Sequence, residues 1–538
     1  MEDRTIANFN SILKQYYDYD GLKPEQYEII NYILEGYDCI AMLHTGFGKS
    51  LIFIMIYLIT KKNVIVISPL ISLMNDQIDK LINLKINAYV FNSTVDLKKL
   101  NKIKRELNEN TGLIYTTPEY FIKEQLFFRE LNNVACLTID ECHCISSFGL
   151  SFRPSYLELH KIKEILVDVP ILCVSGTISQ KVKEDIIKTL KLKKYKIITG
   201  SFNRKNLFVQ IERNNFQTFD KIVDIIKAHK NERIIIYALT RALTESISNK
   251  LNGLSFKSGM YHAGMADDDR LRIQNQFRDN EINIIVSTTS FGLGIDLDIK
   301  VVINYNCPNN IEMYIQMIGR CARTGGHGEC YLFWTPKDME LNRFFIKDYK
   351  KEEKIYQEEQ IRLMEKFVNT TECRKKIALS FLNEHIEDCK TMCDNCICKK
   401  DVIMHNYFKQ TYLICSLLRK YNSQYGSCHF IKILICRKVK EEFMELDEYG
   451  RGLEFGKEDY WKSIFEILKL NDFIESTQMK TGFGSTIKLS SKALKWLNEI
   501  KKKYPIYNTI LSDLNCNGKL MFQSIEQNIK VKQIKIKK

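Results

Sequence analysis

The chain has 538 residues, 45% of them hydrophobic and 27% charged, with a formal net charge of +14. This length predicts roughly three to four domains, and the hydrophobic content excludes a wholly disordered chain. The charge suits a polyanionic partner, although a lysine-rich surface can arise without one. The start, MEDRTIANFN, has no signal-peptide core, and the longest apolar run, 51–59, is shorter than the roughly 20 residues of a membrane helix. We expect a soluble, intracellular protein, nuclear or cytoplasmic, with no membrane partner.

The N-terminal region, residues 10–37, predicts two helices around the stretch 22–30, and Pro24 suits a first helical turn. Gln26 lies about twenty residues before a glycine-rich loop. Its amide offers both a donor and an acceptor, so it could read the edge of an adenine base. A surface glutamine is the alternative interpretation.

The glycine-rich loop Thr45-Gly46-Phe47-Gly48-Lys49-Ser50 separates a predicted buried strand, 39–43, from a predicted buried helix, 51–60. In that context a GxGK[ST] sequence is typical of phosphate binding, because backbone N–H groups at a helix N-terminus attract an anion. Lys49 would reach the β- and γ-phosphates, and the Ser50 hydroxyl would hold Mg²⁺.

Short apolar runs alternate with helical stretches through the first half of the chain. The runs 64–67, 112–115, 134–139 and 170–174 each end in polar residues. This alternation predicts a parallel sheet covered on both faces, with its functional site at the carboxyl ends of the strands.

The run 134–139 ends in Asp140-Glu141-Cys142-His143. Beside a phosphate loop, Asp140 would hold Mg²⁺, Glu141 would orient and deprotonate the attacking water, and His143 would sense the γ-phosphate or relay to the next segment. The loop that follows contains Phe148, Phe152 and Arg153, residue types that stack on unpaired bases and contact phosphates. A packed surface loop is the alternative.

The second half repeats the pattern, with predicted strands at 233–237, 282–286 and 301–305 but no second phosphate loop. Gln316, Arg320 and Arg323 are predicted to lie on one helix, with the two arginines on one face. We expect these arginines to stabilise charge on the γ-phosphate from across a cleft.

Five cysteines between 373 and 398 form a metal-binding pattern around the pair Cys393-Asp394-Asn395-Cys396. Four thiolates make a closed, tetrahedral zinc site. We predict Cys373, Cys389, Cys393 and Cys396 as ligands, with Cys398 as the alternative to Cys389. The other cysteines lie singly in apolar segments, which suits a reducing compartment better than a disulfide framework.

Beyond this cluster, helices are predicted at 405–421, 426–435 and 460–470. The runs 473–477 and 486–489 predict a hairpin whose tip carries Phe483. From residue 501 the chain is polar and basic; this tail either contacts phosphates or is simply a solvated end.

In order, these motifs resemble superfamily-2 helicases of the RecQ type, over about residues 15–500. The resemblance rests on the following stretches: Lys23-Pro24-x-Gln26, Ser68-Pro69-Leu70-Ile71-Ser72-Leu73-Met74-x-Asp76-Gln77, Asp140-Glu141-x-His143-Cys144-Ile145-Ser146, Phe152-Arg153-Pro154-x-Tyr156, Ser201-Phe202-x-Arg204-x-Asn206-Leu207, Tyr261-His262-Ala263-Gly264, Phe291-Gly292-x-Gly294-Ile295-Asp296 and Gln316-x-x-Gly319-Arg320-x-x-Arg323. Leu150 and Ser151 stand where the family usually has His and Asp.

The resemblance implies an α/β fold with two tandem RecA-like parallel-sheet domains, a helical zinc-binding subdomain and a winged-helix domain. The implied ranges are 1–205 and 206–345 for the two lobes, 346–400 for the zinc subdomain, 401–500 for the winged helix and 501–538 for the tail. Tyr19, Lys23 and Gln26 would bind the adenine, and Gly294, Asp296, Gln316, Arg320 and Arg323 would complete the nucleotide cleft. Phe483 would be the tip of a wing that separates the duplex.

We therefore expect an ATP-dependent 3′–5′ DNA helicase of recombination, repair or replication that uses ATP, Mg²⁺ and Zn²⁺. Its partners would be single-stranded and duplex DNA, and it would act as a monomer with protein partners that the sequence does not identify. The alternatives are an RNA helicase and a nucleic-acid-binding scaffold that does not hydrolyse ATP.

Overall fold

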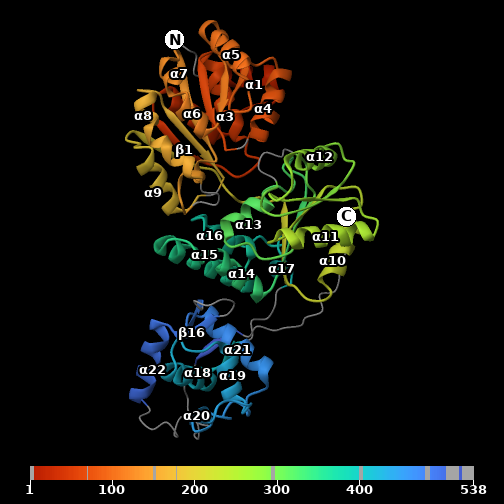
Figure 1. Ribbon diagram of the computed structural model, residues 1–538, viewed down its shortest axis with the longest axis vertical. Coiled ribbons are helices and arrows are strands. Elements are labelled where there is room, and N and C mark those ends of the chain that lie inside the picture. Colours follow the sequence, from red (N-terminus) through yellow and green to blue (C-terminus); the bar gives the residue numbers. More distant parts are fainter. Residues whose placement is uncertain are drawn as a thin grey trace. The chain divides into compact units, whose positions relative to one another are not determined.

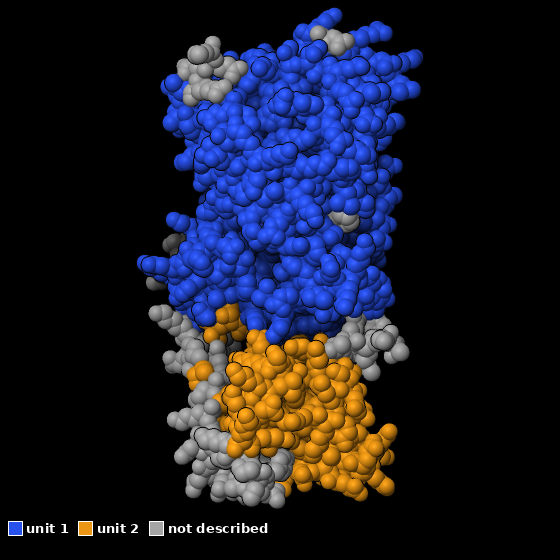
Figure 2. Space-filling view, turned by 90° about the vertical axis from the view of Figure 1, so that its left-hand side faces the viewer, with its two compact units in different colours: residues 1–368, 372–398 blue, residues 369–371, 399–538 orange. Residues whose placement is uncertain are grey.

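The computed structural model describes residues 5–69, 71–148, 153–176, 178–291, 297–398, 404–478, 485–503 and 520–523 (Figure 1). The chain divides into two compact units, coloured separately in Figure 2. The first comprises residues 1–368 and 372–398, and the second comprises residues 369–371 and 399–538. The predicted boundary between zinc subdomain and C-terminal domain, 400/401, falls beside the division at 398/399.

The first lobe of unit 1 is built on a seven-stranded parallel sheet with strand order β3-β4-β2-β5-β6-β1-β7. Its strands are β1 (Asp38–Met42), β2 (Asn63–Ile67), β3 (Ala88–Phe91), β4 (Leu113–Thr116), β5 (Val134–Asp140), β6 (Ile171–Ser175) and β7 (Tyr195–Thr199). Its helices are α1 (Ile6–Tyr17), α2 (Pro24–Leu34), α3 (Lys49–Thr60), α4 (Ile71–Asn83), α5 (Leu97–Glu109), α6 (Pro118–Lys123), α7 (Gln125–Glu130), η1 (Cys142–Ile145), η2 (Pro154–Lys161), α8 (Ile162–Ile165) and α9 (Gln180–Thr189).

The second lobe has a six-stranded parallel sheet with strand order β10-β11-β9-β12-β13-β8. Its strands are β8 (Leu207–Arg213), β9 (Ile234–Tyr237), β10 (Ser258–Tyr261), β11 (Ile284–Ser287), β12 (Val301–Asn304) and β13 (Gly328–Trp334). Its helices are α10 (Thr218–Ala228), α11 (Arg241–Gly253), α12 (Asp267–Arg278) and α13 (Ile311–Ile318).

Alternating residues along each central strand explain why helices cover both faces of each sheet (Figure 1). In β1, Ile40 packs with α5–α9, whereas Cys39 and Ala41 pack with α1–α4. Both faces of the strand are therefore apolar and buried, as a covered parallel sheet requires. In the second lobe, Ile234 and Ile235 likewise join different core clusters. The predicted pair of parallel sheets is confirmed.

Unit 1 ends in a helical region with α14 (Pro336–Phe345), α15 (Lys351–Asn369), α16 (Arg374–Ser380) and α17 (Asp394–Ile397). Unit 2 contains β14 (Met404–Asn406), α18 (Phe408–Lys420), α19 (Ser427–Leu434), α20 (Glu441–Met444), α21 (Glu458–Leu470), β15 (Ile474–Gln478), β16 (Ser485–Leu489), α22 (Ser491–Lys503) and β17 (Met521–Gln523). The expected helices and antiparallel hairpin of this region are present. The winged-helix assignment itself stays a prediction, and Phe483 lies outside the described residues, as does most of the basic tail.

Buried Asp38 fixes the start of β1, the strand that leads into the phosphate loop. Its Oδ1 accepts bonds from the Ile171 backbone N–H at 2.8 Å and from Lys163 Nζ at 2.7 Å. This buried carboxylate, with two donors, ties β1 to β6. Its removal leaves the buried Ile171 N–H without its acceptor and costs Lys163 its ion-pair partner.

We expect Asp38→Ala to lower the free energy of unfolding of this lobe by about 3 kcal/mol, measured by urea denaturation. Glu164→Ala removes the partner of Lys191 in an exposed pair and is the matched control, because such pairs contribute little. Equal denaturation midpoints for Asp38→Ala and the control would contradict the structural role of Asp38.

Candidate functional site

The glycine-rich loop lies between β1 and α3, and two of its glycines have backbone conformations that other residues rarely adopt. Gly46 has φ +84° and Gly48 has φ +93°. A Cβ on Gly48 would lie 2.6 Å from Gln26 Nε2. Gly48 is the N-cap of α3, so the loop ends at the N-terminus of a 12-residue helix. This geometry offers backbone N–H groups and a positive helix end to an anion.

Gln26 and Lys23 brace this loop from the start of α2. Gln26 is buried, and its Nε2 donates to the carbonyls of Phe47 at 3.1 Å and Gly48 at 3.2 Å. Its Oε1 accepts from the Lys23 backbone N–H at 2.9 Å, and Lys23 Nζ lies 4.1 Å from the Phe47 ring centroid. Both groups of the Gln26 amide thus contact the protein's own backbone. Tyr19 is 55% exposed and stacks on Tyr17; its contact with adenine stays a prediction.

Lys49 and Ser50 begin α3 and already have partners. Lys49 Nζ donates to the Leu43 carbonyl at 3.2 Å. Ser50 Oγ accepts from Gln77 Nε2 at 3.2 Å, and Gln77 Oε1 accepts from the Tyr115 hydroxyl at 2.9 Å. Gln77 was singled out only as part of a motif; its contact with Ser50 depends on the packing of α4 against the loop, which the sequence does not reveal.

Asp140 and Glu141 lie where β5 ends, beside the loop. Glu141 has φ +49°, in the left-handed region, so the chain turns sharply at this carboxylate. His143 follows in η1: its Nδ1 lies 2.8 Å from Ser175 Oγ, at the end of β6, and 3.3 Å from Glu141 Oε2. His143 therefore connects the carboxylate to the next strand of the sheet.

The electrostatics of the site differ sharply between the two adjacent carboxyls. Burial and the charge of Glu141 raise the pKa of Asp140. Burial alone would raise the pKa of Glu141 too, but the nearby His143, 3.3 Å away, overcomes this effect and lowers that pKa. Burial lowers the pKa of Lys49; Glu141 and Asp140 oppose this shift, while Arg323 and Arg320 add to it. Glu141 is thus held ionised in a cluster of cations.

Arg320 and Arg323 do not lie on a helix, so that prediction is wrong. Helix α13 ends at Ile318, and both arginines lie in the turn that follows. The helix stops because Cys321 forms a parallel bridge with Ile299, the Ala322 backbone N–H donates to the Ile299 carbonyl at 2.7 Å, and Ala322 takes φ +45°.

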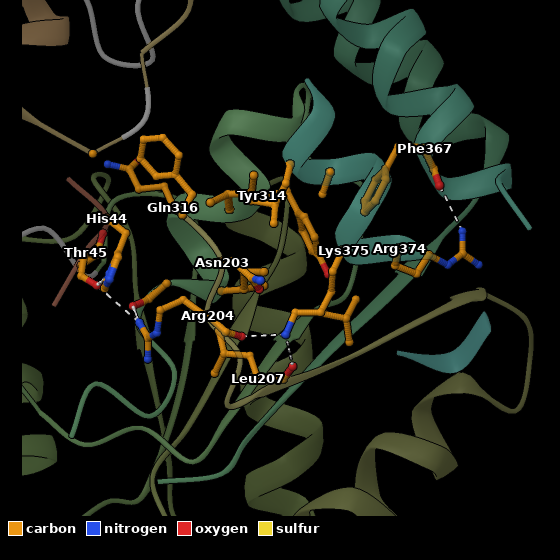
Figure 3. A pocket seen from close by; sticks show the side chains of 18 residues that line it. His44, Thr45, Asn203, Arg204, Leu207, Tyr314, Gln316, Phe367, Arg374 and Lys375 are labelled. Atoms are coloured by element: carbon orange, nitrogen blue, oxygen red, sulfur yellow. Dashed lines mark hydrogen bonds between the residues drawn. The ribbon is translucent and has the colours of Figure 1, made fainter. Parts of the chain in front are cut away.

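The two arginines nevertheless face the phosphate loop of the other lobe. A Cβ built on Gly46 would lie 3.5 Å from Arg323 Cγ. Arg320 is 7% exposed, and its charge acts on both Glu141 and Lys49. Gln316 lines one pocket together with His44 and Thr45 of the first lobe (Figure 3). Gly294 and Asp296 lie outside the described residues.

The aromatic-rich loop is described only at its two ends. Phe148 packs against Tyr356 of α15, with ring centroids 5.1 Å apart, and Lys181 Nζ lies 5.3 Å from its ring. Arg153 donates to the Pro69 carbonyl. Phe148 is therefore half-buried between protein groups, and a stacked base would have to displace Tyr356 or Lys181. Phe152 lies outside the described residues.

The sulfurs of Cys373, Cys389, Cys393 and Cys396 all lie within 4.8 Å of one another. A tetrahedral zinc site with four thiolates places its sulfurs about 3.8 Å apart, so this set fits the ion. Asp394 lies between the two cysteines of the CxxC pair. Its carboxylate forms an ion pair with Arg374 Nε at 3.1 Å and accepts a hydrogen bond from the Ile211 backbone N–H at 3.2 Å. The cluster is thereby attached to β8 of the second lobe.

Three family models match consecutive parts of the chain: the DEAD/DEAH box helicase model at residues 23–185, the helicase conserved C-terminal domain at 217–325 and the RecQ zinc-binding model at 336–397. The ATP-dependent DNA helicase RecQ of Bacillus subtilis is 31% identical over 494 residues, which cover 90% of this chain and 82% of that protein. The chain belongs to the RecQ helicase family.

Two further relatives are similar to this chain over most of its length. A protein of Acanthamoeba polyphaga mimivirus, described as a candidate ATP-dependent RNA helicase, is 35% identical over 515 residues, or 92% of this chain and 93% of that protein. The ATP-dependent helicase SGS1 of Saccharomyces cerevisiae is 29% identical over 530 residues, but the match covers only 36% of its length.

Among solved structures, the helicase Lhr of Mycobacterium smegmatis, bound to single-stranded DNA and AMP-PNP, matches 91% of this chain and 62% of that one. Its TM-score is 0.53 and its identity 14%, which supports the fold alone. Within the ranges that the structure describes, no helix combines the length and the apolar character needed to span a bilayer.

The cysteine cluster makes a sharp prediction for metal content. We expect Cys389→Ser to lose the bound zinc and Cys398→Ser to keep about one zinc per chain, because Cys398 is not among the four clustered sulfurs. Elemental analysis of purified protein measures both. If Cys398→Ser lost the metal and Cys389→Ser kept it, Cys398 rather than Cys389 would be the fourth ligand.

Proposed function

We propose that this protein is an ATP-dependent DNA helicase whose nucleotide lies between the two parallel-sheet lobes. The observation that carries the proposal is the convergence of Lys49 from one lobe and of Arg320 and Arg323 from the other on one glycine-rich loop. Such an arrangement suits phosphoryl transfer, in which catalysis consists mainly of positioning and of stabilising charge on the transferred group.

The residues of the cleft take the following roles. Lys49 and the loop N–H groups bind the phosphates. Ser50 and Asp140 would hold Mg²⁺, which would neutralise phosphate charge. Glu141, kept ionised by His143, orients the attacking water. His143 passes changes at this carboxylate to Ser175, and Gln316, Arg320 and Arg323 stabilise charge from the second lobe. The adenine base is bound by Tyr19, Lys23 and Gln26. For this, the Gln26 amide gives up a hydrogen bond to a loop carbonyl and forms one with the edge of the base.

The four clustered cysteines hold a structural zinc ion. With four protein ligands the site is closed, so its contribution is to folding rather than to chemistry. The hydrogen bond from the Ile211 backbone N–H of β8 to Asp394 fixes the ligand segment against the second lobe. Loss of the metal would therefore impair the unit that contains both lobes.

The nucleic acid is DNA, and the protein moves along a single strand of it in the 3′–5′ direction. It acts in the intracellular compartment where recombination, repair or replication takes place. The net charge of +14 suits contacts with phosphates that are sensitive to salt and insensitive to sequence. RNA is the second candidate, favoured by the description of the mimivirus relative.

We expect Lys49→Ala to abolish DNA-stimulated ATP hydrolysis, because the ammonium that binds the β- and γ-phosphates is lost. DNA binding in the absence of nucleotide should remain nearly unchanged. Phosphate release and fluorescence anisotropy with a labelled single strand measure the two properties. Wild-type rates of hydrolysis in this variant would mean that the site is misassigned.

Matched DNA and RNA forks with single-stranded tails of either polarity test the substrate. We expect ATP-dependent opening of the DNA fork with a 3′ tail and little opening of the other three substrates. Preferential opening of an RNA fork would replace DNA by RNA in the proposal, and opening only from a 5′ tail would reverse the direction.

A further inference from the structure

Arg204 lies in the short linker between β7, which ends at Thr199, and β8, which begins at Leu207. Its guanidinium contacts backbone carbonyls of both lobes (Figure 3). Nη1 donates to Thr45 of the phosphate loop at 3.3 Å and to Gly319 at 3.4 Å. Nη2 donates to Cys321 at 3.0 Å and to Ala322 at 2.7 Å. One side chain thus joins the two loops that form the candidate site.

The carbonyls of Gly319, Cys321 and Ala322 belong to the turn that carries Arg320 and Arg323. A turn at a helix C-terminus has carbonyls that lack helical partners and carry the negative end of the helix dipole. A guanidinium satisfies several such groups at once because its N–H donors form a rigid, planar fork, whereas an ammonium is a single point of charge. The contacts at residue 204 therefore require an arginine rather than a lysine.

The linker is also fixed from its other side. Lys375 is a buried residue of α16, two positions after the zinc-cluster residue Cys373. Its Nζ donates to the carbonyl of Arg204 at 2.6 Å and to that of Leu207 at 3.1 Å. The backbone from which Arg204 projects is thus held by the zinc-binding region, while its side chain holds the catalytic loops (Figure 3).

We propose that Arg204 is a positioning residue for the helicase reaction: it holds the turn that bears Arg320 and Arg323 against the phosphate loop, and Lys375 fixes the linker from which it acts. This inference rests on the proposed ATP hydrolysis. It adds a residue that does not touch the nucleotide but determines whether the two arginines reach the γ-phosphate.

A positioning role predicts a loss of turnover without an equal loss of nucleotide binding. We expect Arg204→Ala to lower the kcat of DNA-stimulated ATP hydrolysis on the order of 100-fold, the cost of misplacing a catalytic group by about 1 Å. Affinity for a non-hydrolysable ATP analogue should change little. Lys205→Ala is the matched control, because this exposed neighbour carries the same charge and should keep wild-type kcat.

The decisive measurement is a double-mutant cycle in single-turnover hydrolysis. If Arg204 acts through the arginine turn, adding Arg204→Ala to Arg320→Ala should cost almost nothing further. A full, additive loss in the double variant would make Arg204 an independent structural residue and overturn the inference, as would wild-type kcat in Arg204→Ala.

Melting temperature and zinc content check the fold of each variant. If Arg204→Ala does not fold, Arg204→Lys keeps the charge but loses the fork, and the same split between kcat and analogue affinity is expected; wild-type kcat in Arg204→Lys would overturn the inference. Absence of hydrolysis by the wild-type protein would instead refute the proposed function, so the two failures are distinguishable.

Discussion

Positive charges from two lobes meet around one glycine-rich loop, and contacts within and between these lobes keep them there. Lys49 comes from the loop itself, while Arg320 and Arg323 come from the turn after α13. Asp140 and Glu141 compensate this charge only in part, and the pKa of Lys49 is lowered as a result of burial and of the neighbouring arginines. An arrangement of cations in a buried site costs free energy unless an anion completes it. The cleft is therefore prepared for a polyanionic ligand.

The two sheets make this convergence possible. In each lobe the strands are parallel, so the loops at their carboxyl ends gather at one edge. The loop after β1 and the turn at Asp140 meet at this edge of the first sheet, and Asp38 secures β1 to β6 below them. Arg204 and Lys375 then secure the linker between the lobes. Each of these contacts joins segments whose relative position the chemistry requires.

Local sequence was sufficient to predict the phosphate loop, the Asp140–His143 segment and most of the central buried strands, because each depends on a few adjacent residues. Five strands of the two parallel sheets were not singled out: β3, β7, β8, β10 and β13. Four of them are edge strands, and β13, which lies between β12 and β8, begins with Gly328-Glu329 rather than with an uninterrupted apolar run. The helical prediction for Arg320 and Arg323 was wrong because a tertiary bridge to Ile299 ends α13 early. The role of Arg204 was not foreseeable, because its partner Thr45 lies 159 residues away in the chain.

We propose that the arginine turn and the phosphate loop form one site that stabilises the transferring phosphoryl group. Its most direct test compares the affinities of wild-type protein and of Arg323→Ala for ADP alone and for ADP with aluminium fluoride, which mimics the transition state. We expect the variant to lose affinity for the fluoride complex while its affinity for ADP is nearly unchanged. Equal affinities of both proteins for the fluoride complex would contradict it.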